Sequence, residues 1–318
     1  MIATIVTALM AGAASALMFA SITSGALVSL ALFYLAPLPL MVAALGWGPA
    51  TSAIGGIAAG LSLGSLFGLP YLAAFILTIA LPSWWLGHLA LLGRPALPAA
   101  APAAAPAIDW YPAGSLLLWI AGFAALTTLS ALLTLGFDGD SILAAMRRGL
   151  MRMMAARGTT PTSELNQLVD ALVTIAPGGA AVVATVTLTL NLFLAGKITA
   201  TSGRLKRNWP DLTRVTLPPM TLVGLCVALA LSFTGGLIGI VGQIVSAALL
   251  MAYALTGLAT LHALTLGRKN RTLWLCCAYA VVTVFGWPVL GLLGLGLADA
   301  IVGLRGPSPF RKAGRPAT

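Results

Sequence analysis

The chain has 318 residues, of which 59% are hydrophobic and 8% charged, and its formal net charge is +10. Soluble domains carry about 25% charged residues, so this composition excludes an ordinary soluble protein and indicates an all-α polytopic membrane protein. The basic residues form short clusters between apolar segments, which is typical of membrane topology and argues against nucleic-acid binding.

The apolar segments predict a bundle of eight to ten transmembrane helices, since a span needs about 20 apolar residues. The last segment, 272–304, is too long for one upright helix, and Gly286-Trp287-Pro288 divides it into two short helices. We expect spans at 2–20, 26–47, 50–67, 71–92, 113–135, 178–197, 218–234, 237–266, 272–286 and 288–304.

The stretch FYLAPLPLM, residues 33–41, places Pro37 and Pro39 inside the second span. Each proline lacks an N–H and clashes with the carbonyl four residues back, so the carbonyls of Phe33 and Leu35 should be unpaired within the helix. Such carbonyls are tolerated where helices pack closely or line a cavity. We therefore predict a kink or break at 34–38 that faces the interior, with Tyr34 beside it as a candidate ligand-binding residue.

Small residues recur at every fourth position in the first and third spans. Such rows let two helix backbones approach closely. They serve either packing within the chain or docking of a partner membrane protein. The candidate docking residues are Ala8, Gly12, Ala16, Ala20, Gly56, Gly60 and Gly64.

An Ala/Pro-rich linker, 94–112, is predicted to separate an N-terminal four-helix unit, 1–93, from a C-terminal membrane unit, 113–304, and a basic tail, 305–318. Residues 136–177 are predicted to be an extramembrane amphipathic segment, with one helix over 140–157. A second helix is expected to start at Thr160-Pro161 and to run toward Ile175. This pair either rests on the membrane surface or folds over the bundle as a lid.

Basic clusters orient the spans, because loops rich in Lys and Arg face the cytoplasm. This rule places the amino terminus, the carboxy terminus and the linker inside, and the segment 136–177 outside. The orienting residues are Lys197, Arg204, Lys206, Arg207, Arg214, Arg268, Lys269, Arg271, Arg305, Arg311, Lys312 and Arg315.

Polar side chains form one broad arc of the eighth span and suggest a ligand site. Hydroxyl and amide groups beside glycines suit a pocket that recognises its ligand by hydrogen bonds without charge. They equally suit ordinary hydrogen bonding between helices. Asn191, in the sixth span, is a further candidate, because its amide needs a partner outside its own helix. The arc comprises Gln243, Ser246, Tyr253, Thr256 and Thr260.

Asp299 is the only acid within a predicted apolar segment. An intramembrane carboxylate is either a coupling site for ions or protons, or half of a structural ion pair, here with Arg268 or Arg271. The chain carries no phosphate-binding loop, hydrolase motif or metal-ligand spacing. We therefore expect no enzyme activity, no catalytic residue, no cofactor and no metal.

The stretches SGALVSLALFYLAPLPLMVAALGWG and LPSWWLGHLALL resemble the YybS-like family of bacterial membrane proteins of unknown function. That family is distantly similar to the substrate-binding subunits of energy-coupling-factor vitamin transporters. The resemblance implies a bacterial inner-membrane protein that binds a small, poorly charged ligand and docks on another transmembrane subunit with ATPases. The row on the first helix would then contact that partner, and residues 138–176 would cover the ligand.

Two alternatives stay open. The chain could be a non-catalytic membrane scaffold that assembles through its Gly and Ala helix faces. It could also be an autonomous secondary transporter coupled through Asp299. The chain has more spans than such substrate-binding subunits usually have, and no vitamin-binding motif.

Overall fold

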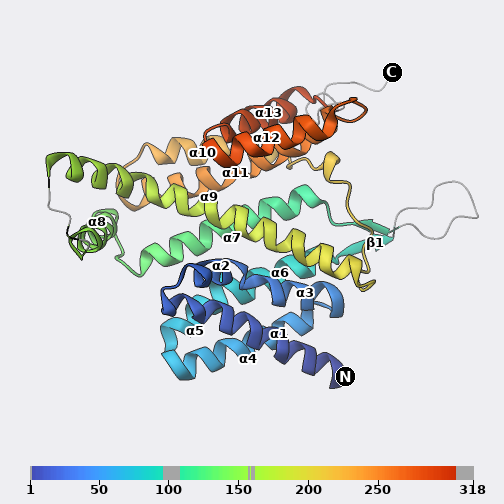
Figure 1. Cartoon of the computed structure of the whole chain (residues 1–318), viewed down its shortest axis with the longest axis horizontal. Helices are drawn as coiled ribbons and strands as arrows, with labels where there is room; N and C mark the ends of the chain where they lie inside the picture. The colour runs from blue at the N-terminus through green and yellow to red at the C-terminus, as the bar shows by residue number, and fades with distance from the viewer. Residues whose placement is uncertain (1, 96–107, 157, 159–161, 306–318) are drawn as a thin grey trace, which may run out of the picture. The chain divides into compact units, whose positions relative to one another are not determined.

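The computed structural model describes residues 2–95, 108–156, 158 and 162–305. The described chain is almost entirely helical, with one short antiparallel strand pair that joins Gly93 to Trp110 (Figure 1). The elements are α1 (Ile2–Ala20), η1 (Ser21–Ser24), α2 (Leu27–Leu35), α3 (Pro37–Trp47), α4 (Pro49–Phe67), α5 (Leu69–Phe75), η2 (Ile76–Ala80), α6 (Leu81–Ala90), β1 (Gly93–Pro95), β2 (Ile108–Trp110), α7 (Ala113–Leu133), α8 (Gly139–Ala156), α9 (Ser163–Thr201), η3 (Leu212–Arg214), α10 (Met220–Ser232), α11 (Gly236–Leu264), α12 (Arg271–Phe285) and α13 (Val289–Val302).

The predicted all-α polytopic fold is confirmed. Seven helical segments of the described residues are long and apolar enough to cross a membrane, and α10, α12 and α13 are shorter apolar helices. Each of the ten predicted segments is helical. The division of 272–304 is also confirmed, because α12 ends at Gly286, whose φ of 69° is a conformation that glycine adopts without strain.

The prediction that the helix before the sixth span ends near Ile175 is wrong. A single helix, α9, runs for 39 residues from Ser163 to Thr201 with Pro177 inside it. One proline removes a single backbone donor, and a long helix accommodates this as a local kink. The expected cap at Thr160-Pro161 lies outside the described residues; within them, the Thr162 hydroxyl accepts from the N–H of Leu165 at 3.2 Å.

The chain divides into two compact units, each described here by itself. Unit 1 comprises 1–123 and 186–210, and unit 2 comprises 124–185 and 211–318. The long helices α7 and α9 therefore contribute residues to both units. The boundary expected at 94–112 does not coincide with this division, since the described residues 94–95 and 108–112 belong to unit 1.

Unit 1 is built from α1–α6 with parts of α7 and α9. Two of its helices begin at prolines: Pro37 starts α3 and Pro49 starts α4. Two clusters of buried apolar residues form its core. One gathers Met41, Leu45, Leu86, Leu89, Ala90, Leu116, Ile120, Phe123, Leu188 and Ala195. The other gathers Phe19, Ala36, Leu40, Ala59, Leu63, Phe75, Ile79 and Ala80.

Unit 2 is organised around α11, against which α10 and α13 pack (Figure 1). The closest approach joins α11 to α13: a Cβ on Gly296 would meet the backbone oxygen of Tyr253, and one on Gly257 would meet that of Leu292. In contrast, α12 has no buried residue. Its described contact with α11 is made by Tyr279, whose ring lies edge-on to that of His262.

Candidate functional site

The predicted break in the second span is present in unit 1. Helix α2 ends at Leu35 and α3 begins at Pro37, with Ala36 between them. Ala36 and Pro37 are both buried, so the break faces the interior as predicted. The N–H of Ala36 donates to the carbonyl of Phe33 at 3.2 Å, so the prediction that this carbonyl is unpaired is wrong. The Ser83 hydroxyl donates to the carbonyl of Pro37 at 3.3 Å.

Asn191 supplies a further donor at this break. Its side chain is fully buried, and its Nδ2 donates to the carbonyl of Tyr34 and to that of Thr187, each at 2.8 Å. Its Oδ1 has no hydrogen-bond partner among the described residues. Tyr34 itself is 39% exposed. Tyr34 therefore contributes its backbone oxygen to the contact with Asn191, and its role in ligand binding stays a prediction.

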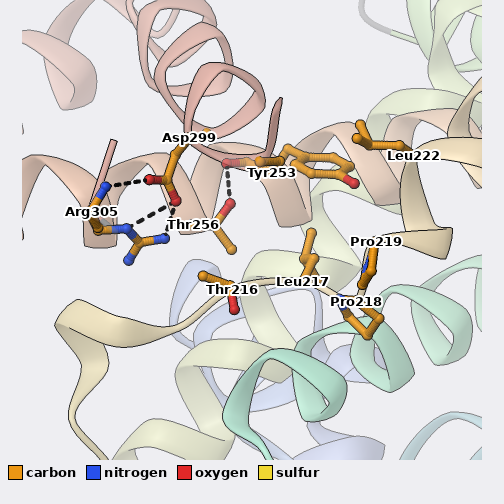
Figure 2. Close-up of a pocket in the computed structure, with 11 residues that line it drawn as sticks. Thr216, Leu217, Pro218, Pro219, Leu222, Tyr253, Thr256, Asp299 and Arg305 are labelled. Carbon is orange, nitrogen blue, oxygen red and sulfur yellow. Dashed lines mark hydrogen bonds and ion pairs between the residues drawn. The ribbon is translucent and has the colours of Figure 1, made fainter. Parts of the chain in front are cut away.

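In unit 2, a small cavity lies between α11, α13 and the irregular segment before α10 (Figure 2). Its volume is about 30 Å³. This holds about one or two water molecules and is far below the several hundred Å³ of a typical small-molecule site. Its lining comprises Thr216, Leu217, Pro218, Pro219, Leu222, Tyr253, Thr256, Gly296, Asp299, Ala300 and Arg305.

Three residues singled out in the sequence meet at this cavity: Tyr253 and Thr256 from α11, and Asp299 from α13. The Thr256 hydroxyl donates to the carbonyl of Tyr253 at 2.9 Å. Figure 2 shows the ring of Tyr253 directed toward Leu222, while Asp299 lies toward Arg305. Hydroxyl groups, an ion pair and apolar surface therefore share one small enclosure.

Asp299 forms an ion pair with Arg305, at 2.6 Å, and both side chains are almost buried, at 6% and 11% exposure. The expectation of Arg268 or Arg271 as its partner is wrong. Helix α13 ends at Gly303 in the left-handed conformation, with φ 75°, and this turns the chain back so that Arg305 reaches Asp299. The sequence gives no direct sign of this turn, and it is the turn that decides which arginine reaches Asp299.

Arg305 also joins two parts of unit 2. Its Nη1 donates to the carbonyl of Thr213 at 2.6 Å, and its Nη2 donates to that of Val215 at 2.9 Å. The Asp299 carboxylate accepts from the backbone N–H, the Nε and the Nη2 of the same arginine. This network fits a structural ion pair, and ion coupling through Asp299 stays a prediction.

The other polar residues of α11 do not line this cavity. The Nε2 of Gln243 donates to the carbonyl of Thr174 on α9 at 2.7 Å. The Ser246 hydroxyl donates to the Gln243 carbonyl at 3.1 Å, and the Thr260 hydroxyl donates to the Thr256 carbonyl at 3.0 Å. These bonds correspond to the second interpretation of the polar arc, hydrogen bonding within and between helices.

The small-residue rows pack inside unit 1. Ala8 and Gly12 are buried against α4, where a Cβ on Gly12 would meet the backbone oxygen of Gly55. Ala16 and Ala20 are half-buried against the core cluster around Phe19. In α4, the row faces neighbouring helices of the same unit: Gly56 faces Ala80, Gly60 faces Ile76 and Gly64 faces Leu72. Packing thus occupies these surfaces, and docking of a partner through them stays a prediction.

Among the residues that the structure describes, no group of three His, Cys, Asp or Glu side chains could hold a metal ion. A family model described as "Predicted membrane protein (DUF2232)" matches residues 12–300. This match is consistent with the expected resemblance to YybS-like membrane proteins of unknown function. Neither the comparison with curated proteins nor that with solved structures gave a match.

Proposed function

The chain belongs to this DUF2232 family of multi-pass membrane proteins, and from that premise we propose that it binds a small, poorly charged ligand at the unit 2 cavity. The observation that carries the proposal is the meeting of Tyr253, Thr256 and Asp299 in one enclosure. Because Asp299 and Arg305 neutralise each other, the lining carries no net charge. Such a lining favours an uncharged ligand that forms hydrogen bonds.

The wall made by Thr216, Leu217, Pro218 and Pro219 supports this proposal. The segment is irregular, and the carbonyls of Pro218 and Pro219 accept from the N–H groups of Thr221 and Leu222 at the start of α10. Irregular backbone beside short apolar helices is a recurring way to line a membrane binding site. Next to it, the buried hydroxyl of Thr221 has no hydrogen-bond partner in the described parts of the chain. Because the cavity is small, we propose that ligand entry displaces this wall from α11.

A panel of water-soluble vitamins and neutral metabolites, applied to the purified protein in detergent, tests the proposal. We expect at least one compound to raise the melting temperature. Thr256→Val and Tyr253→Phe should reduce that rise, because each removes one hydroxyl from the site. Ser246→Ala is the matched control, since it removes a hydroxyl of α11 that does not line the cavity. A panel without effect, or an equal rise in all variants, would count against the site.

The transport role and the bacterial inner membrane belong to the same proposal. In it, energy for uptake comes from another transmembrane subunit with ATPases, and both termini face the cytoplasm. The support is the sequence resemblance to transporter substrate-binding subunits, which is an argument by analogy with that family. Uptake of the identified ligand in cells that express the chain with and without that partner would measure this role.

One observation favours the scaffold as a second candidate: helix α12 carries large apolar residues and buries none of them. Trp274 and Phe285 are 61% and 62% exposed. We propose that a partner helix packs on α12 within the membrane. The exposed Cys276 and Cys277 provide native positions for cross-linking on this helix, and exposed Cys226 on α10 is the matched control. A cross-linked partner seen equally from Cys226, or from neither helix, would contradict the scaffold.

A further inference from the structure

The segment 202–210 is fixed onto one end of unit 1 by contacts with three helices. Arg204 lies over the ring of Trp47, at the end of α3, with 4.5 Å from its Cζ to the ring centroid. Arg207 donates to the carbonyl of Ala90, at the end of α6, at 3.2 Å. Trp209 returns to α9, where the Nζ of Lys197 lies 4.4 Å from its ring centroid. The segment therefore holds its cations in a defined arrangement.

We call Lys197, Arg204, Lys206 and Arg207 the basic rim. Its charges have no carboxylate partner among the described residues, although all seven acids of the chain are described. Four of these acids form ion pairs elsewhere, and the other three form none with the residues that the structure describes. The arginines in these four pairs are not part of the basic rim: they are Arg94, Arg147, Arg214 and Arg305. The basic rim is thus an uncompensated cluster of positive charge.

Within the basic rim, Arg207 is the residue that a bound anion would stabilise most. Its side chain is half-buried, and burial lowers the pKa of its guanidinium below the usual value. A guanidinium has five N–H donors, yet Arg207 donates a single hydrogen bond, to Ala90, within the described residues. Its Nε is buried and has no hydrogen-bond partner in the part of the chain that the structure describes. A desolvated cation with open donors is stabilised by a bidentate anion, and phosphate has the required geometry.

Aromatic residues that contact the basic rim indicate its expected depth in the membrane. Trp47 and Trp209 hold its cations directly. Nearby in unit 1, the ring centroids of Trp85 and Trp119 are 5.3 Å apart, and Trp119 donates to the Tyr111 hydroxyl at 3.2 Å. Tryptophan and tyrosine concentrate at the level of the lipid headgroups in membrane proteins. By this preference, we expect the basic rim at the depth of the lipid phosphates.

We propose that the basic rim binds the phosphate of an anionic phospholipid, with Arg207 as its central ligand. Lys197, Arg204 and Lys206 add the charge that selects an anionic lipid over a zwitterionic one, as basic clusters beside spans do. The occupant is a lipid of the surrounding bilayer, since the aromatic residues beside the basic rim favour the headgroup layer. This inference is independent of the ligand proposed for unit 2.

Lipid retention by the full-length protein tests the proposal. The protein would be reconstituted in nanodiscs of phosphatidylcholine with a minor fraction of phosphatidylglycerol, and binding of a labelled phosphatidylglycerol would be titrated. We expect K197Q/R204Q/R207Q to bind it at least about fivefold more weakly for each cation removed. Arg94→Gln is the matched control: it lies in unit 1, is exposed and is already paired with Asp109. It should change binding less than twofold.

Three further measurements make the outcome decisive. K197Q/R204Q replaces only exposed side chains, so it keeps the test available if the triple variant misfolds, and it should also lose affinity for phosphatidylglycerol. Arg207→Lys keeps the charge but loses the bidentate geometry, and should bind at an intermediate level. Inorganic phosphate should not displace the lipid at equal concentration. Equal binding by the wild-type protein and K197Q/R204Q, or equal affinity for phosphatidylcholine, would overturn the proposal.

Discussion

The side-chain amide of Asn191 donates to the backbone carbonyl of Tyr34 at 2.8 Å, across 157 positions of the sequence. This bond satisfies an acceptor beside the break between α2 and α3, where prolines interrupt the helix. In lipid no water is available to replace a lost backbone bond, so an amide from α9 takes that role. The break and Asn191 are therefore parts of one structural feature.

We expect substitutions of Asn191 to destabilise unit 1 by an amount that depends on which polar or charged group they leave buried without a hydrogen bond. Asn191→Leu removes two hydrogen bonds but also removes the unpaired Oδ1, so the cost should be modest, about 1 kcal/mol. Asn191→Asp should cost more, because it places a carboxylate against the Tyr34 carbonyl. Unfolding in mixed detergent, followed by circular dichroism, measures both. An aspartate variant as stable as the wild-type protein would contradict this account.

The sequence predicted the helices well because each depends on local information. Apolar length defined the ten segments, and Gly286 and Pro37 marked two breaks. The partners across the fold could not be predicted in this way. Asn191 visibly needed an outside acceptor, but its bond to Tyr34 depends on tertiary packing. Likewise, the pairing of Asp299 with Arg305 follows from the left-handed turn at Gly303.

The candidate site was predicted only in part, for a physical reason. An arc of polar residues shows which side of a helix is polar, but it does not show which part of the chain packs against that side. Tyr253 and Thr256 meet the cavity because the segment before α10 lies against them. Gln243 instead meets a carbonyl of α9. The small-residue rows were similarly ambiguous, since a surface that permits close approach serves a neighbouring helix and a separate protein equally well.

The ion pair of Asp299 and Arg305 should contribute strongly to the stability of unit 2. Arg305→Gln leaves the buried Asp299 carboxylate without its counter-ion, and we expect a loss of about 3–5 kcal/mol. Arg214→Gln is the matched control, because it removes the same charge from an exposed pair with Asp211 and should have little effect. Chemical denaturation of both variants in detergent gives the comparison. Similar midpoints for the two would refute the structural role of the buried pair.

Acid should weaken the start of α8, which lies outside the predicted spans. The Asp138 carboxylate accepts from the backbone N–H of Ser141 at 2.9 Å. Hydrogen bonds from the Ser141 backbone and side chain lower the pKa of Asp138 below its usual value. Because the folded pKa is lower than the unfolded one, this stabilisation is present above the unfolded pKa and is lost as the pH falls through the folded pKa.

Hydrogen exchange of α8, corrected for the intrinsic rate, should therefore accelerate below about pH 4 in the wild-type protein. Asp138→Asn keeps an acceptor at the cap but does not titrate, so its exchange should show no such acid step. Asp138→Ala should exchange faster at every pH. An acid step of the same size in the asparagine variant would assign the effect to another group.

The close contact of α11 with α13 predicts different effects on stability for alanine substitutions at two glycines of α13. A Cβ on Gly296 would meet the backbone oxygen of Tyr253, which cannot move without moving α11. We expect Gly296→Ala to cost at least about 1–3 kcal/mol of unfolding free energy and to displace the wall of the adjacent cavity. For Gly294, nothing lies within 4 Å of the added Cβ. Gly294→Ala should therefore leave stability unchanged or raise it by up to about 1 kcal/mol, because alanine favours the helix. Thermal unfolding of the two variants, made in the same detergent, separates them; equal midpoints would show that α13 does not approach α11 at Gly296.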